Sequence, residues 1–176
     1  RGSLQLVVAD GDQVPVIYRD DARGAIDVGS GQEQSLVLYA KSGPVDSPIE
    51  ARLVGADGRI HWQQRLPQPA ACLRSTQELI VGVGPSLGLD EAAATIRRRG
   101  DAAITTAQVA AKEDLPDRWW GYDGVDCLVL ATSDLTFIQG LSSDQRQAIV
   151  DWVKLGGRLL LSVGDHGAEI ADAASG

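Results

Sequence analysis

Three side chains with the chemistry of a hydrolase stand close together late in the chain: Ser162, Asp165 and His166. In such enzymes an imidazole takes the proton of the serine hydroxyl, and an acid orients the imidazole. Neighbouring side chains at a strand end point to opposite sides, which works against these residues meeting at one substrate atom. We therefore expect a polar strand-to-loop transition here, with a hydrolase that uses these residues as the alternative.

Two acids, Asp134 and Asp165, follow strongly apolar runs, and His166 and Glu169 stand near the second of them. Acids at the ends of neighbouring strands could share a magnesium ion, and a histidine beside acids could hold a transition metal. Aspartate also stabilises turns at strand ends without any ligand. We expect no metal and no other cofactor, and a metal-dependent enzyme built on Asp134, Asp165 and His166 is the alternative.

The sequence GVGPSLG, residues 82–88, has the small residues of a phosphate-binding turn between a strand and a helix. Backbone N–H groups at such a turn point to the bound phosphate. Dinucleotide sites also need an acid near the end of the second strand, which AAITTAQVA lacks, and Pro85 removes one donor. The sequence thus favours a tight turn, and it leaves Gly84 and Ser86 as candidate ligand-binding residues.

The segment LPDRWWGYDGVD, residues 115–126, gathers aromatic rings in a chain that is otherwise poor in them. A buried large ring contributes about 1.5–3 kcal/mol, whereas a ligand platform needs its rings exposed. Adjacent residues of an extended chain point to opposite sides. We therefore predict that Trp119 packs inside the protein and that Trp120 faces outward as a candidate ligand-binding residue.

From residue 78 on, apolar runs alternate with helical patterns, which predicts a doubly wound, flavodoxin-like parallel sheet over residues 78–176. The expected strands are residues 78–84, 102–109, 124–131 and 158–164, and the expected helices are residues 90–100 and 141–157. Ser142 can cap the second helix with Gln145 as its reciprocal partner, and Gly156 or Gly157 can end it. Four strands are few for such a sheet and the chain has no methionine, so we expect a fragment that continues past Gly176.

Residues 1–67 consist of short apolar runs separated by turn residues, which predicts a small antiparallel β-sandwich of immunoglobulin-like type. The expected strands are residues 4–8, 14–18, 34–40, 49–55 and 59–66. The last two form a hairpin, in which Asp57 and Gly58 supply the positive φ angles of a tight turn. Pro67 and Pro69 favour extended chain, and residues 68–77 are predicted to be a linker.

The chain has a net charge of −8, most of it after residue 75. An acidic surface repels phosphate backbones, and Arg97 to Arg99 stand where cations complement a helix end, so we expect no nucleic-acid partner. No run approaches the roughly 18 apolar residues that span a bilayer, so any membrane contact would come from segments outside this sequence. Cys72 and Cys127 lack the spacing of a zinc or redox site.

Two patterns in the second half resemble the class I glutamine amidotransferase-like superfamily. They are most similar to uncharacterised extracytoplasmic members within larger bacterial membrane proteins, where an immunoglobulin-like domain precedes them. The first pattern is P-x-x-W-x-G-Y-x-x-V-D, matched here by Pro116, Trp119, Gly121, Tyr122, Val125 and Asp126. The second is A-x-x-x-W-V-x-x-G-G-x-L, matched here by Ala148, Trp152, Val153, Gly156, Gly157 and Leu159.

The resemblance also bears on catalysis. Catalytic members of the superfamily carry a nucleophilic cysteine on the sharp turn after the strand that corresponds to residues 158–164, in a G-x-C-x-G setting. Val163 stands at about this position, and Cys127 belongs to an apolar run of the preceding strand. The resemblance therefore implies a non-catalytic binding or scaffolding module on the outer side of a bacterial membrane. Its partner would be another protein or the remainder of the same polypeptide.

Overall fold

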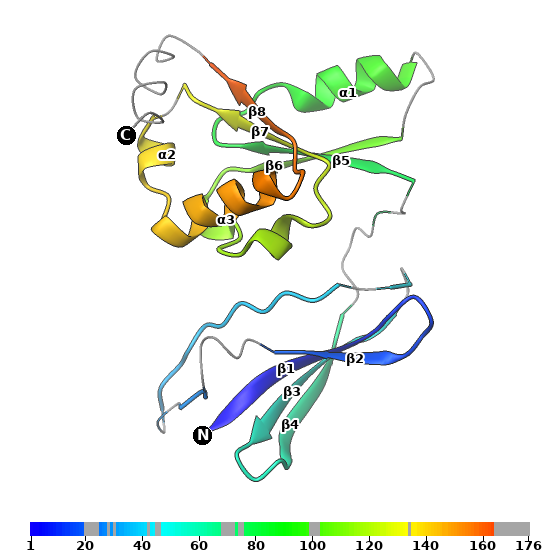
Figure 1. Ribbon diagram of the computed structural model, residues 1–176, viewed down its shortest axis with the longest axis vertical. Helices are drawn as coiled ribbons and strands as arrows, with labels where there is room; N and C mark the ends of the chain where they lie inside the picture. The colour runs from blue at the N-terminus through cyan, green and yellow to red at the C-terminus, as the bar shows by residue number, and fades with distance from the viewer. Residues whose placement is uncertain are drawn as a thin grey trace. The chain divides into compact units, whose positions relative to one another are not determined.

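The computed structural model describes residues 1–19, 25–27, 29, 31–41, 43–44, 47–67, 73, 76–98, 103–133 and 135–163. The chain forms two compact units, Arg1–Cys72 and Leu73–Gly176 (Figure 1). The boundary between the units lies inside residues 68–77, the segment predicted as a linker. Each unit contains a four-stranded sheet.

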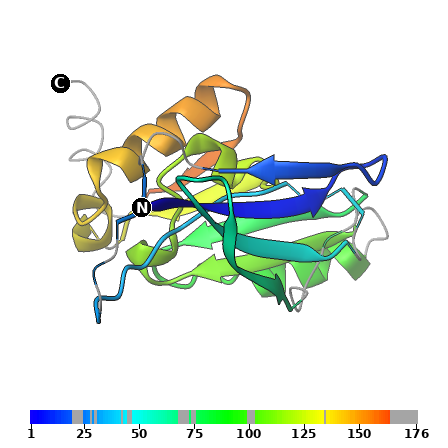
Figure 2. The ribbon, with the colours of Figure 1, turned by 90° about the horizontal axis from the view of Figure 1, so that it is seen from below.

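The first unit is built on an antiparallel sheet with the strand order β2-β1-β3-β4. Its strands are β1 (Gly2–Ala9), β2 (Pro15–Tyr18), β3 (Ile49–Gly55) and β4 (Ile60–Leu66). Figure 2 shows β1 and β2 side by side, as their pairing requires. Four of the five strands predicted for this half are therefore confirmed, with small shifts at their ends. The buried side chains Val8 and Ala51 belong to the two central strands.

The β3–β4 hairpin forms at the predicted place, but its turn differs from the predicted one. We expected positive φ at both Asp57 and Gly58; of the two, only Gly58 adopts it, at 78°. The Gly55 N–H donates to the Arg59 carbonyl at 2.8 Å, so the loop has three residues, a length that places one glycine in the left-handed region. The Asp57 carboxylate instead accepts the Arg59 N–H at 3.1 Å.

Residues 34–40 were expected to form a strand, and this prediction is wrong. They lie outside both sheets, and Val37 among them is 51% exposed. Apolar alternation favours a strand only where a neighbouring strand offers hydrogen-bond partners and a surface to pack on. In the described part of the first unit, the strands therefore form one sheet rather than two packed sheets.

The second unit is built on a parallel sheet with the strand order β6-β5-β7-β8. Its strands are β5 (Glu78–Val83), β6 (Ile104–Val109), β7 (Cys127–Ala131) and β8 (Leu159–Ser162). Its helices are α1 (Leu89–Arg98), α2 (Leu135–Gln139) and α3 (Ser143–Lys154), with 3-10 turns η2 (Lys112–Asp114) and η3 (Trp119–Tyr122). The four predicted strands and both predicted helices are confirmed, whereas α2 and the 3-10 turns were not predicted.

Helices cover both faces of the parallel sheet, with α1 and α3 on opposite sides (Figure 1). The main core lies on the α3 face, where Val81 and Leu128 of the sheet pack with Ile149 and Trp152 of the helix. On the other face Leu89 of α1 approaches Gly82, whose Cβ would lie 2.8 Å from it. Alternate residues of β5 and β7 thus contact different helices, which explains why these strands read as continuous apolar runs.

The ends of α3 are fixed as the sequence predicts. Ser142 Oγ accepts the Gln145 N–H at 3.1 Å, and Gln145 Oε1 accepts the Ser142 N–H at 3.0 Å, which completes the capping box. Gly156 follows the helix with a φ of 107°, a conformation that favours glycine. Gly157 is required for another reason, since a Cβ there would lie 2.3 Å from the Trp152 ring.

Candidate functional site

The carboxyl ends of the parallel strands form the candidate site, because open α/β sheets bind ligands at this edge where the strand order reverses. Here the order reverses between β5 and β7. Of the predicted site residues, Gly84 follows β5, Ser86 lies between β5 and α1, and Ser162 ends β8. Asp134, Asp165 and His166 lie outside the residues that the structure describes.

The turn after β5 is closed by hydrogen bonds to β6. Gly84 is buried with a φ of 91°, and its N–H donates to the Val109 carbonyl at 3.0 Å. Its own carbonyl accepts from Gln108 Nε2 at 2.7 Å. The backbone groups of Gly84 are thus already paired within the fold, while Ser86 is exposed. This geometry agrees with a tight turn, which the sequence favoured over a phosphate-binding loop.

The first turn of α1 is acidic, because Asp90 and Glu91 stand directly after the helix begins. The Asp90 carboxylate also accepts a hydrogen bond from the Thr106 hydroxyl of β6. Acids at a helix N-terminus complement its dipole and repel a bound anion. The geometry and the charge at this turn therefore both disfavour phosphate.

Ser162 is held by a residue that the sequence analysis did not single out. Thr132 is fully buried after β7, and its hydroxyl donates to the Ser162 carbonyl at 2.8 Å. The Thr132 N–H donates to the same carbonyl at 3.2 Å. A threonine immediately after a buried strand was the available signal. Through these two bonds Thr132 joins the ends of β7 and β8, a structural role.

The aromatic segment behaves differently from the prediction. Trp119 is 38% and Trp120 45% exposed, and their rings meet edge to face with centroids 5.6 Å apart. The buried ring is Tyr122, which is 2% exposed. We expected extended chain, in which neighbours point to opposite sides, but residues 119–122 form a 3-10 turn, in which successive side chains are only about 120° apart, so Trp119 and Trp120 can both lie at the surface. Trp119 as the packed ring is therefore wrong, whereas the outward position of Trp120 is confirmed.

Asp126, the last residue of the first pattern, joins three strands at the amino end of the sheet. Its carboxylate accepts the Leu79 N–H at 2.7 Å, and its own N–H donates to the Leu79 carbonyl at 2.9 Å. Its carbonyl accepts from Arg158 Nε at 2.9 Å. The carboxylate thus serves strand pairing at the edge opposite the candidate site.

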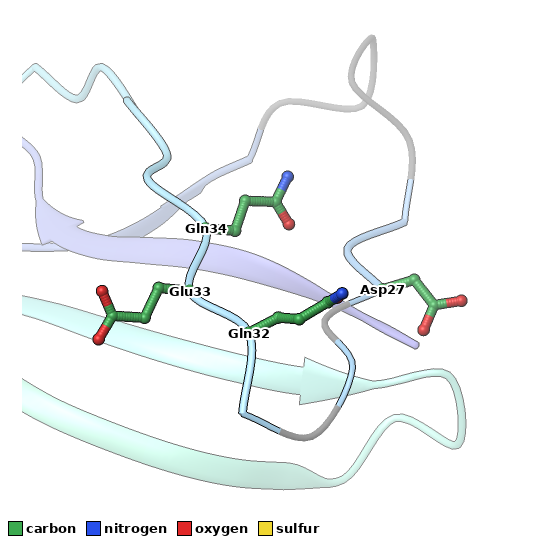
Figure 3. A pocket seen from close by; sticks show the side chains of 4 residues that line it. All are labelled: Asp27, Gln32, Glu33 and Gln34. Carbon is green, nitrogen blue, oxygen red and sulfur yellow. The ribbon is translucent and has the colours of Figure 1, made fainter.

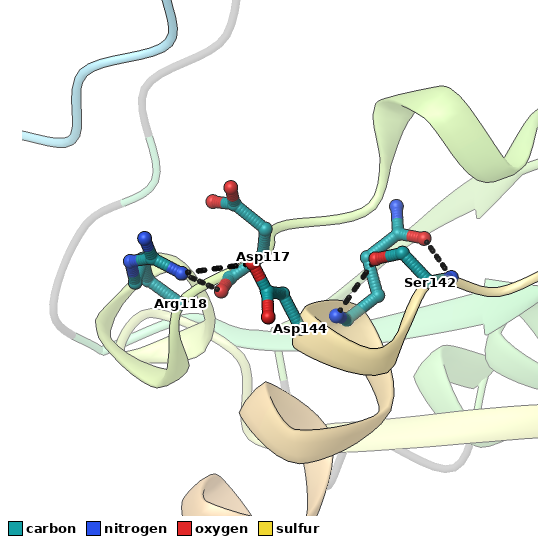
Figure 4. Close-up of polar contacts among 5 residues, drawn as sticks. Asp117, Arg118, Ser142 and Asp144 are labelled. Carbon is teal, nitrogen blue, oxygen red and sulfur yellow. Dashed lines mark hydrogen bonds and ion pairs between the residues drawn. The ribbon is translucent and has the colours of Figure 1, made fainter. Parts of the chain in front are cut away.

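The start of α3 carries a group of polar contacts (Figure 4). Arg118 lies 3.7 Å from the Asp144 carboxylate and donates to the Asp117 carbonyl at 2.9 Å. Buried Gln145 donates to the carbonyls of Lys112 and Leu115, at 2.6 and 3.0 Å. These contacts hold the crossover that precedes β7 against the helix. They do not bring a nucleophile and a base together.

A hollow of about 450 Å³ in the first unit is lined by Asp27, Gln32, Glu33 and Gln34. Figure 3 shows the carboxylates of Asp27 and Glu33 pointing away from each other. Asp27 also pairs with Arg1 at 3.0 Å. The two acids therefore do not act on one ligand. Across the residues that the structure describes, no group of three or more His, Cys, Asp or Glu side chains could hold a metal ion.

Comparisons with protein-family models and with solved structures assign no family to the chain. No protein-family model matches it. No solved structure matches it significantly. Within the described ranges, no helix combines the length and the apolar character needed to cross a bilayer.

Proposed function

We propose that this chain is a non-catalytic binding or scaffolding module of a larger bacterial envelope protein. In this proposal an immunoglobulin-like domain, residues 1–67, precedes a class I glutamine amidotransferase-like α/β domain, residues 78–176. The strand order of the second unit supports the α/β half, because flavodoxin-like sheets begin with the same order, second, first, third, fourth. The antiparallel first sheet is compatible with the immunoglobulin-like half.

The observation that carries the proposal is Val163. It follows β8, where catalytic relatives in the superfamily would present their cysteine, and its side chain is 56% exposed. Acyl transfer needs a nucleophile at the tip of this turn, and an isopropyl group has no lone pair to supply. The half-buried Cys127 lies on β7.

The patterns that carry the resemblance support the same proposal. Tyr122 and Trp152 lie in the core, Asp126 pairs strands, and Gly157 leaves room for an indole ring. Each of these residues is packed or hydrogen-bonded within the fold. A domain that keeps its packing residues without the nucleophile is suited to binding.

An activity screen tests the proposal against the hydrolase and metal-dependent alternatives. The wild type, Ser162→Ala and an Asp165→Ala, His166→Ala double variant are assayed with glutamine and with a p-nitrophenyl ester, with and without Mg²⁺. We expect background turnover from all three proteins. Turnover by the wild type that is lost in either variant would replace the module with an enzyme.

A thiol probe tests the assignment of position 163. In a Cys72→Ala, Cys127→Ala background, Val163→Cys places a thiol on the exposed turn, and we expect rapid modification by a thiol reagent. The matched control returns the half-buried Cys127 alone and should react more slowly. Equal rates would contradict an exposed position after β8.

The proposed partner is a protein or the remainder of the same polypeptide, and the proposed location is the outer side of a bacterial membrane. The net charge of −8 argues against nucleic acid. In the full-length protein, Ser133→Cys provides an exposed label site. A membrane-impermeant thiol reagent should label it in intact cells, and labelling that requires lysis would contradict this location.

A further inference from the structure

Trp119 and Trp120 are exposed side by side on a turn that is anchored in the core. Their side chains are 38% and 45% exposed. The anchor is Tyr122, which is 2% exposed and whose hydroxyl donates to the Pro116 carbonyl at 3.0 Å. A partner that binds to an anchored turn has little chain to order, so the two rings are presented at a low cost in entropy.

The planes of the two rings are almost perpendicular. The angle between them is 81°, and their centroids lie 5.6 Å apart in an edge-to-face contact. A flat group such as a sugar ring stacks on one aromatic face, and a second ring at a right angle adds little to that contact. A compact cation, in contrast, is attracted to the electron-rich face of each ring. The ring geometry therefore favours a cationic group over a flat neutral one.

An acid accompanies each ring. Arg118 is extended, with a φ of −137° and a ψ of 140°, so the side chains on either side of it, Asp117 and Trp119, leave the chain in the same direction. Asp123 is exposed, and its N–H donates to the Trp120 carbonyl at 3.2 Å. Side chains three apart in a 3-10 turn lie one above the other, which puts Asp123 beside Trp120. Each carboxylate thus leaves the chain on the same side as one of the rings.

The charge around the two rings is negative. Residues 113–123 contain four acids and one base. That base, Arg118, lies 3.7 Å from the Asp144 carboxylate and donates to the Asp117 carbonyl at 2.9 Å. Arg118 is therefore held by groups of the fold, and the acids of the segment outnumber it. A negative field of this kind attracts cations and repels anions.

We propose that Asp117, Trp119, Trp120 and Asp123, which we call the tryptophan corner, bind a lysine or arginine side chain on a basic segment of a partner protein. The ammonium or guanidinium group would lie against the ring faces, and the carboxylates would balance its charge. Tryptophan and arginine are also the residues that most often dominate the energy of protein interfaces. The inference rests on the proposed function, since it states which chemistry the binding module recognises in its partner.

Trp62 provides an internal comparison, because it is as exposed as the corner but lies among different charges. Its side chain is 44% exposed on β4, and Leu53 lies opposite it on β3. Residues 59–65 contain two bases, Arg59 and Arg65, and no acid. We therefore expect Trp62 to bind no cation, although its exposure equals that of Trp120.

Nuclear magnetic resonance of the isotope-labelled 176-residue chain tests the proposal, because each indole N–H gives a signal of its own. The probe is the capped peptide Gly-Arg-Gly-Arg-Gly, and the same peptide with citrulline in place of arginine is its uncharged counterpart. We expect the arginine peptide to shift the Trp119 and Trp120 signals to saturation and to leave Trp62 and Trp152 unchanged. The citrulline peptide should bind about fivefold more weakly or worse.

Substitutions separate attraction between a cation and a ring from simple apolar contact. Trp120→Phe keeps an aromatic face and should bind the arginine peptide within about threefold of the wild type, whereas Trp120→Leu should bind it about fivefold more weakly or worse. Asp123→Asn should weaken binding and reduce its dependence on salt. The matched control is Glu33→Gln, which removes an exposed acid of the first unit and should leave binding unchanged. Circular dichroism and thermal unfolding establish that each variant is folded.

Several outcomes would overturn the proposal. Unchanged Trp119 and Trp120 signals would mean that the corner is covered or binds no cation. Equal binding of the arginine and citrulline peptides, or of the wild type and Trp120→Leu, would mean that charge and ring face play no part. An equal response of Trp62 would indicate general attraction to an acidic chain. None of these results would affect the non-catalytic proposal, which the activity screen tests separately.

Discussion

The rings of Tyr122 and Trp152 lie with their centroids 5.8 Å apart and their planes at 37°. Both are almost fully buried, at 2% and 5% exposure. The Tyr122 hydroxyl donates to the Pro116 carbonyl at 3.0 Å, so its polar end is satisfied inside the same segment. This contact joins the two sequence patterns, because Tyr122 belongs to the first and Trp152 to the second. The aromatic segment therefore packs into the core through Tyr122 rather than through a tryptophan.

Truncation of the buried Tyr122 should destabilise the protein far more than truncation of the exposed Trp120. We expect Tyr122→Ala to lower the free energy of unfolding by about 3–5 kcal/mol, because it leaves a cavity against Trp152. Trp120→Ala, the matched control, should change it by about 1 kcal/mol or less, since its ring is 45% exposed. Urea unfolding followed by far-UV circular dichroism measures both. Similar losses for the two variants would contradict the assignment.

The second glycine after α3 should tolerate no side chain. Gly157→Ala places a Cβ 2.3 Å from the Trp152 ring, and we expect a loss of about 1–3 kcal/mol from overpacking. Gly124→Ala is the control, because its Cβ would meet no atom within 4 Å and its φ is not positive. Thermal and urea unfolding should separate the two variants. A neutral Gly157→Ala would mean that the indole ring can move aside at little cost.

The parallel half of the fold could be predicted because its signals are local. A strand buried on both faces is a continuous apolar run, as in residues 127–131, and a capping box is readable from Ser142 and Gln145. Turn geometry was harder to predict from the sequence, since the length of the β3–β4 loop depends on the pairing of Gly55 with Arg59. The strand predicted for residues 34–40 was wrong for the same reason, because a strand depends on a partner distant in sequence.

The candidate site was harder to predict than the fold. Gly84 and Ser162 were chosen for their positions at strand ends, but the partners of their backbone groups, Gln108 and Thr132, come from other strands. Side chains that lie far apart in sequence carry no local signal of their pairing. Trp119 was assigned to the core by the alternation of an extended chain, and a 3-10 turn has a different period.

The Asp126 carboxylate should act as a hydrogen-bond acceptor for strand pairing. Asp126→Ala leaves the Leu79 N–H without its partner at 2.7 Å, and we expect a loss of about 1–3 kcal/mol. Asp126→Asn keeps an acceptor oxygen and should retain most of the stability. Asp144→Ala is the surface control, whose ion pair at 3.7 Å should contribute about 1 kcal/mol or less. Urea unfolding ranks the three variants, and an Asn variant as unstable as Ala would argue against this role.

The Gln145 side chain should contribute more to the free energy of unfolding than its part in the helix cap alone would give. It accepts the Ser142 N–H and donates to the carbonyls of Lys112 and Leu115, so Gln145→Ala leaves three backbone groups without these partners. We expect a loss of about 2–3 kcal/mol, against about 1 kcal/mol for Ser142→Ala, which removes one cap bond. The matched control is Gln147→Ala, whose exposed contact to Asp151 should contribute about 0.5 kcal/mol or less.

A double-mutant cycle measures how far the two halves of this cap depend on each other. Ser142 and Gln145 exchange both capping hydrogen bonds, so their losses should not add, and we expect a coupling of about 0.5–1 kcal/mol from urea unfolding of the two single variants and the double variant. The bonds from Gln145 to the crossover do not involve Ser142, so the Gln145 loss should persist in a Ser142→Ala background. Its disappearance there would mean that the crossover is held to α3 by the cap alone.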